Sequence, residues 1–287
     1  MYPILFRIPE WIPFLGGEPI TSFGVMMLGS FLTAGYFLRA EMGRMGLERE
    51  QAWDILFMAV VGGILGAKIY YMLLNWPRLV ADPAGMILSR GGMVWYGGFI
   101  LGTALVLWKI RQLKLPMAKV VDACAPAIAI AYAVGRFGCF LVGDDYGRPT
   151  GSWVGMAFPD GTPPTTVDAL ERNFGITVDP ELVERFGQVI PVHPTQLYEI
   201  GLSLVFFVVL WRMRRHTRAA GWLFAVWLTL AGFERFFVEI FRAKDDRFLG
   251  VFTVAQLISV VLIAVGFYWV FRLKDGDEAP AGSPAGA

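Results

Sequence analysis

Seven apolar segments separated by polar connections run along the chain, and they limit its possible folds more than any other feature. We predict membrane-spanning helices at 23–38, 53–74, 96–108, 120–142, 197–211, 222–241 and 251–271. Charged residues make up 17% of the chain, below the roughly 25% of an average soluble protein. Lipid cannot satisfy backbone polar groups, so segments of this kind cross a membrane as helices. The sequence therefore predicts an all-α integral membrane bundle of about seven transmembrane helices.

The polar connections define the remaining organisation. We predict one membrane-embedded domain over 1–274, with an extracytoplasmic loop or head region at 143–194, and a disordered C-terminal tail at 275–287, which is rich in Ala, Gly and Pro. Lys and Arg are concentrated in the short loops that follow the first, third, fifth and seventh segments. The positive-inside rule then places the N-terminus outside and the C-terminus in the cytoplasm.

Composition also excludes several classes of protein. The net charge is only +1, and no basic run with interleaved aromatic residues is present, so we expect no nucleic-acid partner. The two cysteines, Cys124 and Cys139, have neither the spacing of a metal site nor the number needed for a disulfide framework. We therefore expect no metal and no cofactor.

An arginine lies inside the fourth predicted helix, where the chain reads GRFGCFLVGDDYGR from Gly135. An ionised arginine at membrane depth costs a few kcal/mol, so Arg136 should face the interior of the bundle and have a partner there. A guanidinium group binds a phosphate through two parallel hydrogen bonds. The following glycines permit close approach of a backbone or a ligand. We infer a phospholipid head-group site at Arg136.

A second charged group lies on the sixth predicted helix. Arg235 and Glu239 are four residues apart and share one helix face, and Arg242 follows near that face. The functional interpretation is a second clamp for a phosphate or a carbonyl group, in which Glu239 holds the arginines in position. The alternative is an ion pair that only packs helices. Lys68, which also lies inside a predicted span, either pairs with a carboxylate or extends its ammonium group toward the membrane surface.

Two further motifs contain polar groups. The run HPTQLYE begins at His193, at the start of the fifth predicted helix. His193 is either a general base or a loop residue held by a hydrogen bond, and Gln196 and Glu199 are placed to reach Arg136 or Arg235. Tyr96 precedes a glycine pair at the start of the third helix. Its hydroxyl either points at the reacting centre or belongs to an interfacial aromatic cluster.

Together these motifs resemble the prolipoprotein diacylglyceryl transferase family of bacterial inner membranes. The resemblance rests on the residues 135–148, on the complete run 193–199 and on the Arg235, Glu239 and Arg242 pattern, and it covers most of 23–271. It implies transfer of diacylglyceryl from phosphatidylglycerol to the lipobox cysteine thiol in the signal peptide of a prolipoprotein. It also implies contact with membrane lipid and a multi-pass location in the inner membrane.

The resemblance also implies roles for individual residues. Arg136 and Arg235 would bind the lipid phosphate and stabilise the leaving group, while Glu239, Glu199 and Gln196 orient them. The expected catalytic residues are Arg136, Arg235, Glu239, Tyr96 and His193. The expected substrate-binding residues are Arg136, Asp144, Gly147, Gln196, Glu199 and Arg242.

Some positions depart from the pattern of the family. Typical members have histidine at the position of Tyr96, asparagine at Cys139, glutamate at Asp144 and tyrosine at Ala231. Tyrosine is a poor base at neutral pH because its pKa is about 10, so His193 or Asp144 would have to take the thiol proton. The alternatives are a divergent paralogue with another acceptor or lipid, a non-catalytic lipid-binding protein, and a transporter with an anion site at Arg136.

Overall fold

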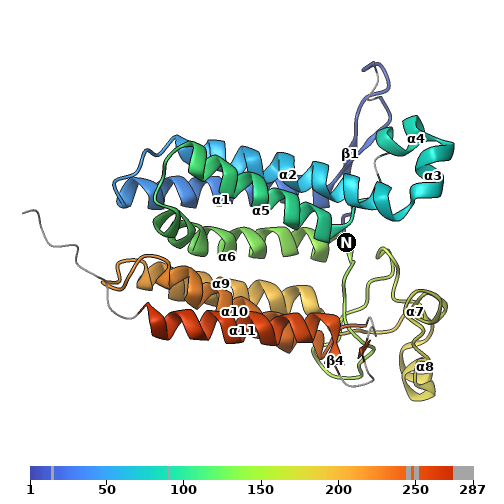
Figure 1. Cartoon of the computed structure of the whole chain (residues 1–287). Coiled ribbons are helices and arrows are strands. Elements are labelled where there is room, and N and C mark those ends of the chain that lie inside the picture. Colours follow the sequence, from blue (N-terminus) through green and yellow to red (C-terminus); the bar gives the residue numbers. More distant parts are fainter. Residues whose placement is uncertain (14–15, 90, 244–246, 249–251, 274–287) are drawn as a thin grey trace, which may run out of the picture. The chain divides into compact units, whose positions relative to one another are not determined.

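The computed structural model is mainly helical, and it describes residues 1–13, 16–89, 91–243, 247–248 and 252–273. Its long helices each coincide with one predicted span (Figure 1), which confirms the predicted fold class. They are α1 (Ser22–Arg44), α2 (Gln51–Leu74), α5 (Trp95–Gln112), α6 (Met117–Val142), α9 (Thr195–Met213), α10 (Trp222–Glu239) and α11 (Val254–Arg272).

Five of these helices, α1, α2, α6, α9 and α11, are long and apolar enough to cross a membrane by length and composition. The other two carry more polar residues. α5 ends in Lys109, Ile110, Arg111 and Gln112, and α10 contains three charged residues. The predicted end of the third span at residue 108 was too early, because the helix continues through this polar turn and Lys109 lies 3.4 Å from Asp54 on α2.

The short elements were not predicted. They are β1 (Ile4–Arg7), β2 (Pro19–Thr21), α3 (Trp76–Ala81), α4 (Pro83–Leu88), α7 (Val167–Phe174), α8 (Pro180–Phe186), β3 (Arg247–Phe248) and β4 (Phe252–Thr253). β1 pairs with β2 and β3 with β4, both antiparallel. Three of the short helices begin at a side-chain cap, supplied by Asp82, Thr166 and Asp179. Such caps satisfy backbone N–H groups that have no partner inside the helix.

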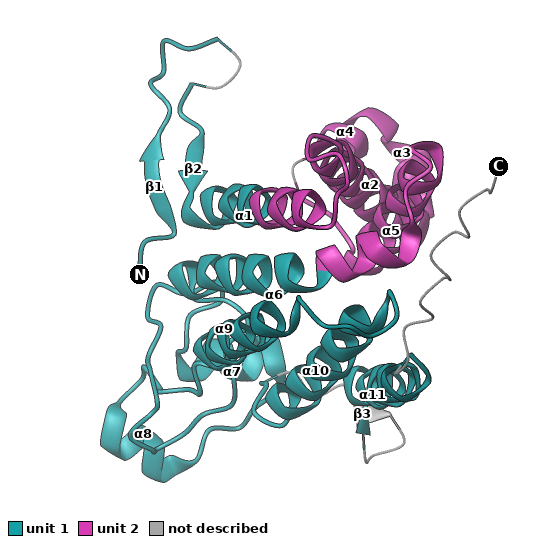
Figure 2. Cartoon of the chain, turned by 90° about the vertical axis from the view of Figure 1, so that its left-hand side faces the viewer, with its two compact units in different colours: residues 1–33, 125–287 teal, residues 34–124 magenta. Residues whose placement is uncertain are grey.

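The chain divides into two compact units (Figure 2). Unit 1 contains Met1–Thr33 and Ala125–Ala287, and unit 2 contains Ala34–Cys124. The prediction of one membrane domain over 1–274 stays a prediction, and the predicted tail lies outside the described residues.

In unit 2, α2 and α5 pack through glycines. A Cβ atom on Gly66 would collide with the carbonyl oxygen of Gly97, and a Cβ atom on Gly62 would lie 2.7 Å from the Cα atom of Gly102. These positions therefore need glycine for close helix packing. Lys68 on α2 donates hydrogen bonds to the backbone oxygens of Ser89 and Gly91, at 2.6 and 2.9 Å, and forms no ion pair with a carboxylate of the described residues.

In unit 1, the stretch 143–194 forms a packed head and not an extended loop. Its core contains the buried side chains Tyr146, Phe158, Leu170, Val178, Ile190 and Val192. Antiparallel bridges join Pro149 and Met156 to Val192, and a further bridge joins Gly147 to Arg242 just beyond α10. The head is therefore fixed to the end of α10. This places the acidic turn directly after α6, which contains Asp144 and Asp145, beside the charged residues of α10.

Candidate functional site

Arg136 is buried at the head end of α6 and is held by Glu199 on α9. Its Nε atom donates to Glu199 Oε2 at 2.5 Å, and its Nη2 atom donates to the same oxygen. The other oxygen, Oε1, accepts a hydrogen bond of 2.8 Å from the Tyr132 hydroxyl. Glu199 is only 1% exposed. This ion pair confirms that Arg136 has a buried partner, as the cost of a membrane arginine requires.

Asp145 joins Arg136 to a second arginine. Its Oδ2 atom lies 3.0 Å from Arg136 Nη1, and its Oδ1 atom lies 2.9 Å from Arg242 Nη2. The turn is sharply bent, with a φ of 56° at Asp145, and Thr195 Oγ1 donates to the Asp145 carbonyl oxygen at 2.7 Å. Partial burial alone would raise the pKa of the Asp145 carboxyl, but Arg242 and Arg136 together lower it. This bridging role was not predicted, although the Asp144–Asp145 pair directly after the helix was a visible signal in the sequence.

The charged residues near the end of α10 form the predicted group. Arg235 Nη2 lies 2.7 Å from Glu239 Oε2, and Arg242 Nε lies 3.8 Å from the same oxygen. Glu239 is buried, and its Oε2 atom contacts both arginines. Arg242 itself lies beyond the helix, in the bridge with Gly147. A Cβ atom on Gly147 would collide with the carbonyl oxygen of Phe241, so glycine is required for this approach.

The structure places the remaining predicted polar residues around the same turn. Gln196 Nε2 donates to the backbone carbonyl oxygen of Asp144 and not to an arginine. Polar atoms of Cys139, Asp144 and Asp145 lie within 4.8 Å of one another. Arg136 Nη1 also donates to Cys139 Sγ at 3.4 Å. This spacing would suit a cation, but the arginines already compensate the Asp145 carboxylate, so we assign no metal to the cluster.

Asp144 differs from its neighbour. Its Oδ1 atom is buried and has no hydrogen-bond partner among the described residues. Burial, followed by the charge of Asp145, raises the pKa of the Asp144 carboxyl. A carboxylate oxygen in this position is available to accept a proton or a substrate hydrogen bond.

His193 lies between the head and α9. Its Nδ1 atom is 3.0 Å from the Tyr198 hydroxyl, and its ring centroid is 5.0 Å from that of Phe241. Burial lowers the pKa of the imidazole, so it is neutral at pH 7. These contacts support the loop-fixing interpretation, while general-base catalysis by His193 stays a prediction.

Tyr96 belongs to unit 2, in the first turn of α5. It is half exposed, and its ring is packed edge-on against Trp95 with centroids 5.4 Å apart. Its predicted catalytic role therefore stays a prediction.

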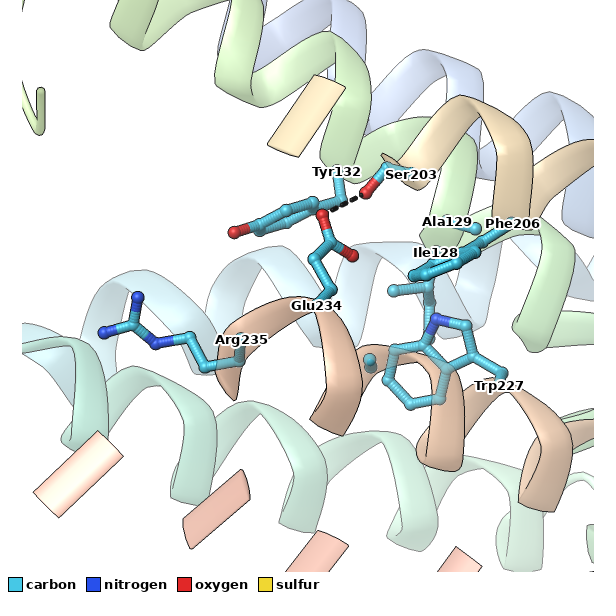
Figure 3. Close-up of a pocket in the computed structure, with 9 residues that line it drawn as sticks. Ile128, Ala129, Tyr132, Ser203, Phe206, Trp227, Glu234 and Arg235 are labelled. Atoms are coloured by element: carbon cyan, nitrogen blue, oxygen red, sulfur yellow. Dashed lines mark hydrogen bonds between the residues drawn. The ribbon is translucent and has the colours of Figure 1, made fainter. Parts of the chain in front are cut away.

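A pocket lies between α6, α9 and α10 (Figure 3). Its empty volume is about 430 Å³, including the open mouth. The lining residues are Ile128, Ala129, Tyr132, Ser203, Phe206, Trp227, Ala231, Glu234 and Arg235. Ser203 Oγ donates to Glu234 Oε1 at 2.8 Å, and Glu234 is buried. The pocket is thus polar at one end and apolar at the other.

The chain is similar to known proteins over most of its length. Residues 9–272 match the prolipoprotein diacylglyceryl transferase family. Proteins named phosphatidylglycerol–prolipoprotein diacylglyceryl transferase from Geobacter sulfurreducens and Nitrosomonas europaea are each 30% identical to this chain. The Geobacter alignment covers 92% of each protein, and the Nitrosomonas alignment covers 93% of this chain and 91% of the relative. A protein of the same name from Corynebacterium glutamicum is 28% identical over 95% of this chain and 85% of the relative. The chain belongs to the prolipoprotein diacylglyceryl transferase family.

Proposed function

We propose that this protein transfers the diacylglyceryl group of phosphatidylglycerol to the lipobox cysteine thiol of a prolipoprotein, as in bacterial lipoprotein maturation. The observation that carries the proposal is the buried Arg136, held by Glu199 and linked through Asp145 to Arg242. A charged group inside a membrane protein marks a functional site by default, and a guanidinium group is well shaped to bind a phosphate. The names of the relatives identify that anion as the phosphate of phosphatidylglycerol.

The reaction replaces a carbon–oxygen bond with a carbon–sulfur bond. The thiolate attacks the glyceryl carbon that carries the phosphate, and the bonding electrons leave on the oxygen of glycerol phosphate. Arg136 and Arg235 bind this phosphate and stabilise the negative charge that develops on it. Glu199 and Glu239, each in contact with one of the two arginines, keep the guanidinium groups in place. Arg242 and Gly147 complete the wall of the site.

The thiol must lose its proton before or during attack. Asp144 is the acceptor that the geometry favours, because its buried Oδ1 atom has no hydrogen-bond partner among the described residues and its pKa is raised. A base is most effective when its pKa approaches the working pH. His193 is the other candidate within unit 1, and its neutral imidazole is able to accept a proton. Tyr96 would donate a hydrogen bond and would not act as the base.

The family consists of bacterial inner-membrane enzymes, and several helices of this chain are apolar enough to span a membrane. We propose that the N-terminus is extracytoplasmic and the C-terminus cytoplasmic, because Lys and Arg are concentrated in the loops that this orientation places inside. The head region 143–194 and Arg136 would then lie toward the outer surface, where a translocated prolipoprotein arrives.

Complementation tests the proposal. The full chain is expressed in a bacterium depleted of its own transferase, and prolipoprotein conversion is followed by gel mobility and by mass. We expect conversion by the wild type and none by Arg136→Ala or Arg235→Ala, although both variants insert into the membrane. Arg172→Ala is the matched control, because Arg172 is exposed on α7. A folded wild-type protein without conversion would overturn the proposal in favour of a paralogue with another acceptor or a lipid-binding role.

A further inference from the structure

We propose that the pocket between α6, α9 and α10 holds one acyl chain of the donor phospholipid and selects the donor by the length of that chain. The identity of the donor rests on the proposed function, whereas the pocket and its polarity do not. The reaction leaves both acyl chains unchanged, so it does not by itself require a pocket for them.

On each of the two helices that carry Arg136 and Arg235, residues that line the pocket precede the arginine at intervals of four. Along α10, Trp227, Ala231 and Arg235 follow at intervals of four and line one side of the pocket. Along α6, Ile128 and Tyr132 precede Arg136 at the same interval. A helix rises 1.5 Å per residue, so the apolar end of the pocket lies roughly 12 Å below the level of the arginines.

This order matches the order of groups in a phospholipid. A phosphate held at the level of Arg136 and Arg235 places the glyceryl esters about one helix turn deeper and the acyl chains deeper still. Ser203 lies one helix turn along α9 from Glu199, the partner of Arg136, and it donates a hydrogen bond of 2.8 Å to the Glu234 carboxyl group. Figure 3 shows the Glu234 carboxyl group directed toward Ser203, while the Arg235 side chain extends away from Trp227. The Ser203–Glu234 pair is therefore the last polar contact before the apolar end.

The apolar end fits an acyl chain and excludes the other parts of the lipid. Its walls are Ile128, Ala129, Phe206 and Trp227. A head-group hydroxyl placed there would lose its hydrogen bonds to water without replacement. Methylene groups would instead gain contacts with aromatic and aliphatic side chains in a confined space. Ala231 contributes only a methyl group to the pocket, so the side chain at this position determines how much of a chain can enter.

Ala231→Phe should close the pocket. Transfer by the full-length protein is measured with dilauroyl- and dipalmitoyl-phosphatidylglycerol, and binding of the same lipids to the detergent-solubilised protein is measured by native mass spectrometry. We expect the ratio of kcat/KM for the long-chain over the short-chain donor to fall about tenfold or more, because a single methylene in a hydrophobic pocket already gives about tenfold discrimination and the chains of these donors differ by several methylenes. Trp227→Ala, which lengthens the pocket, should shift the ratio in the opposite direction.

Gly201→Phe is the control, because Gly201 is exposed on α9 and a Cβ atom there meets nothing within 4 Å. It should leave the ratio unchanged. A misfolded variant would lose both donors equally, and Trp227→Ala then decides the result. Ratios that stay at the wild-type value in both pocket variants would overturn the inference. If the wild type transfers neither lipid, the proposed function fails, and the ratio of bound lipids still tests the pocket.

Discussion

Replacing Glu199 by glutamine should destabilise the protein and abolish transfer. Glu199 accepts hydrogen bonds from Arg136 Nε and Nη2 and from the Tyr132 hydroxyl. Glutamine has nearly the same shape but has no charge, and its amide nitrogen would face one of these donors. Among the described carboxylates, Arg136 would then be paired only with Asp145, whose side chain is 45% exposed.

The size of the effect follows from the burial of the pair. Removing one member of a buried ion pair typically costs about 3–5 kcal/mol, because the other charge stays buried without compensation. Replacing both members by apolar residues is often nearly neutral for the same reason. The double variant Arg136→Met/Glu199→Leu should therefore recover more than half of the stability that Glu199→Gln loses. Neither variant should transfer diacylglyceryl, because neither keeps the oriented guanidinium group.

Thermal unfolding in detergent measures the stability of each variant, and prolipoprotein conversion measures transfer. Glu50→Gln is the matched control, since the Arg39–Glu50 pair is exposed, with side chains 41% and 66% accessible. An exposed pair contributes at most about 1 kcal/mol. A melting temperature of Glu199→Gln equal to that of the wild type, or a double variant less stable than the single one, would refute the reasoning.

Three other substitutions have defined outcomes. Asp145→Asn should strengthen binding to phosphatidylglycerol vesicles several-fold, because Arg136 and Arg242 lose a competing carboxylate. These arginines lower the pKa of the Asp145 carboxyl in the folded protein. Its ion pairs therefore stabilise the fold fully above the ordinary aspartate pKa of about 4, and this stabilisation is lost as the pH falls below that value. Acid should lower the melting temperature of the wild type more than that of the variant. Tyr96→Phe should slow conversion, whereas an unchanged rate would assign Tyr96 to packing. His193→Gln should retain most of the rate at pH 7, and a loss of a hundredfold or more would instead identify His193 as the base.

The membrane helices could be predicted because the length of an apolar segment is a property of the sequence alone. The end of α5 could not be predicted in this way, because Lys109 and Arg111 interrupt the apolar run while the backbone continues as a helix. The short helices α7 and α8 have no long periodic pattern, and their caps, Thr166 and Asp179, are common loop residues. Their positions depend on the core of the head, which forms only when distant residues meet.

The charged residues of the site that lie inside apolar segments could be predicted, because a charge in such a segment is evident from the sequence. Arg136, Arg235 and Glu239 were identified in this way, and the spacing of four between Arg235 and Glu239 correctly predicted their ion pair. The partner of Arg136 was left open between Gln196 and Glu199. These two residues lie three apart on the same helix, and only the packing of α9 against α6 decides between them. Gln196 contacts a backbone carbonyl instead, which no spacing rule predicts.

The charges around the site indicate that the Asp145 side chain should change its position when the lipid phosphate binds. Three arginines meet three carboxylates in contacts of 4 Å or less, and these residues are Arg136, Arg235, Arg242, Glu199, Glu239 and Asp145. A lipid phosphate adds a negative charge to this balanced group, and an unpaired charge is costly where water is scarce. The side chains of Glu199 and Glu239 are 2% exposed, whereas that of Asp145 is 45% exposed. Asp145 is therefore the carboxylate that can move into water, and the phosphate would take its place beside Arg136.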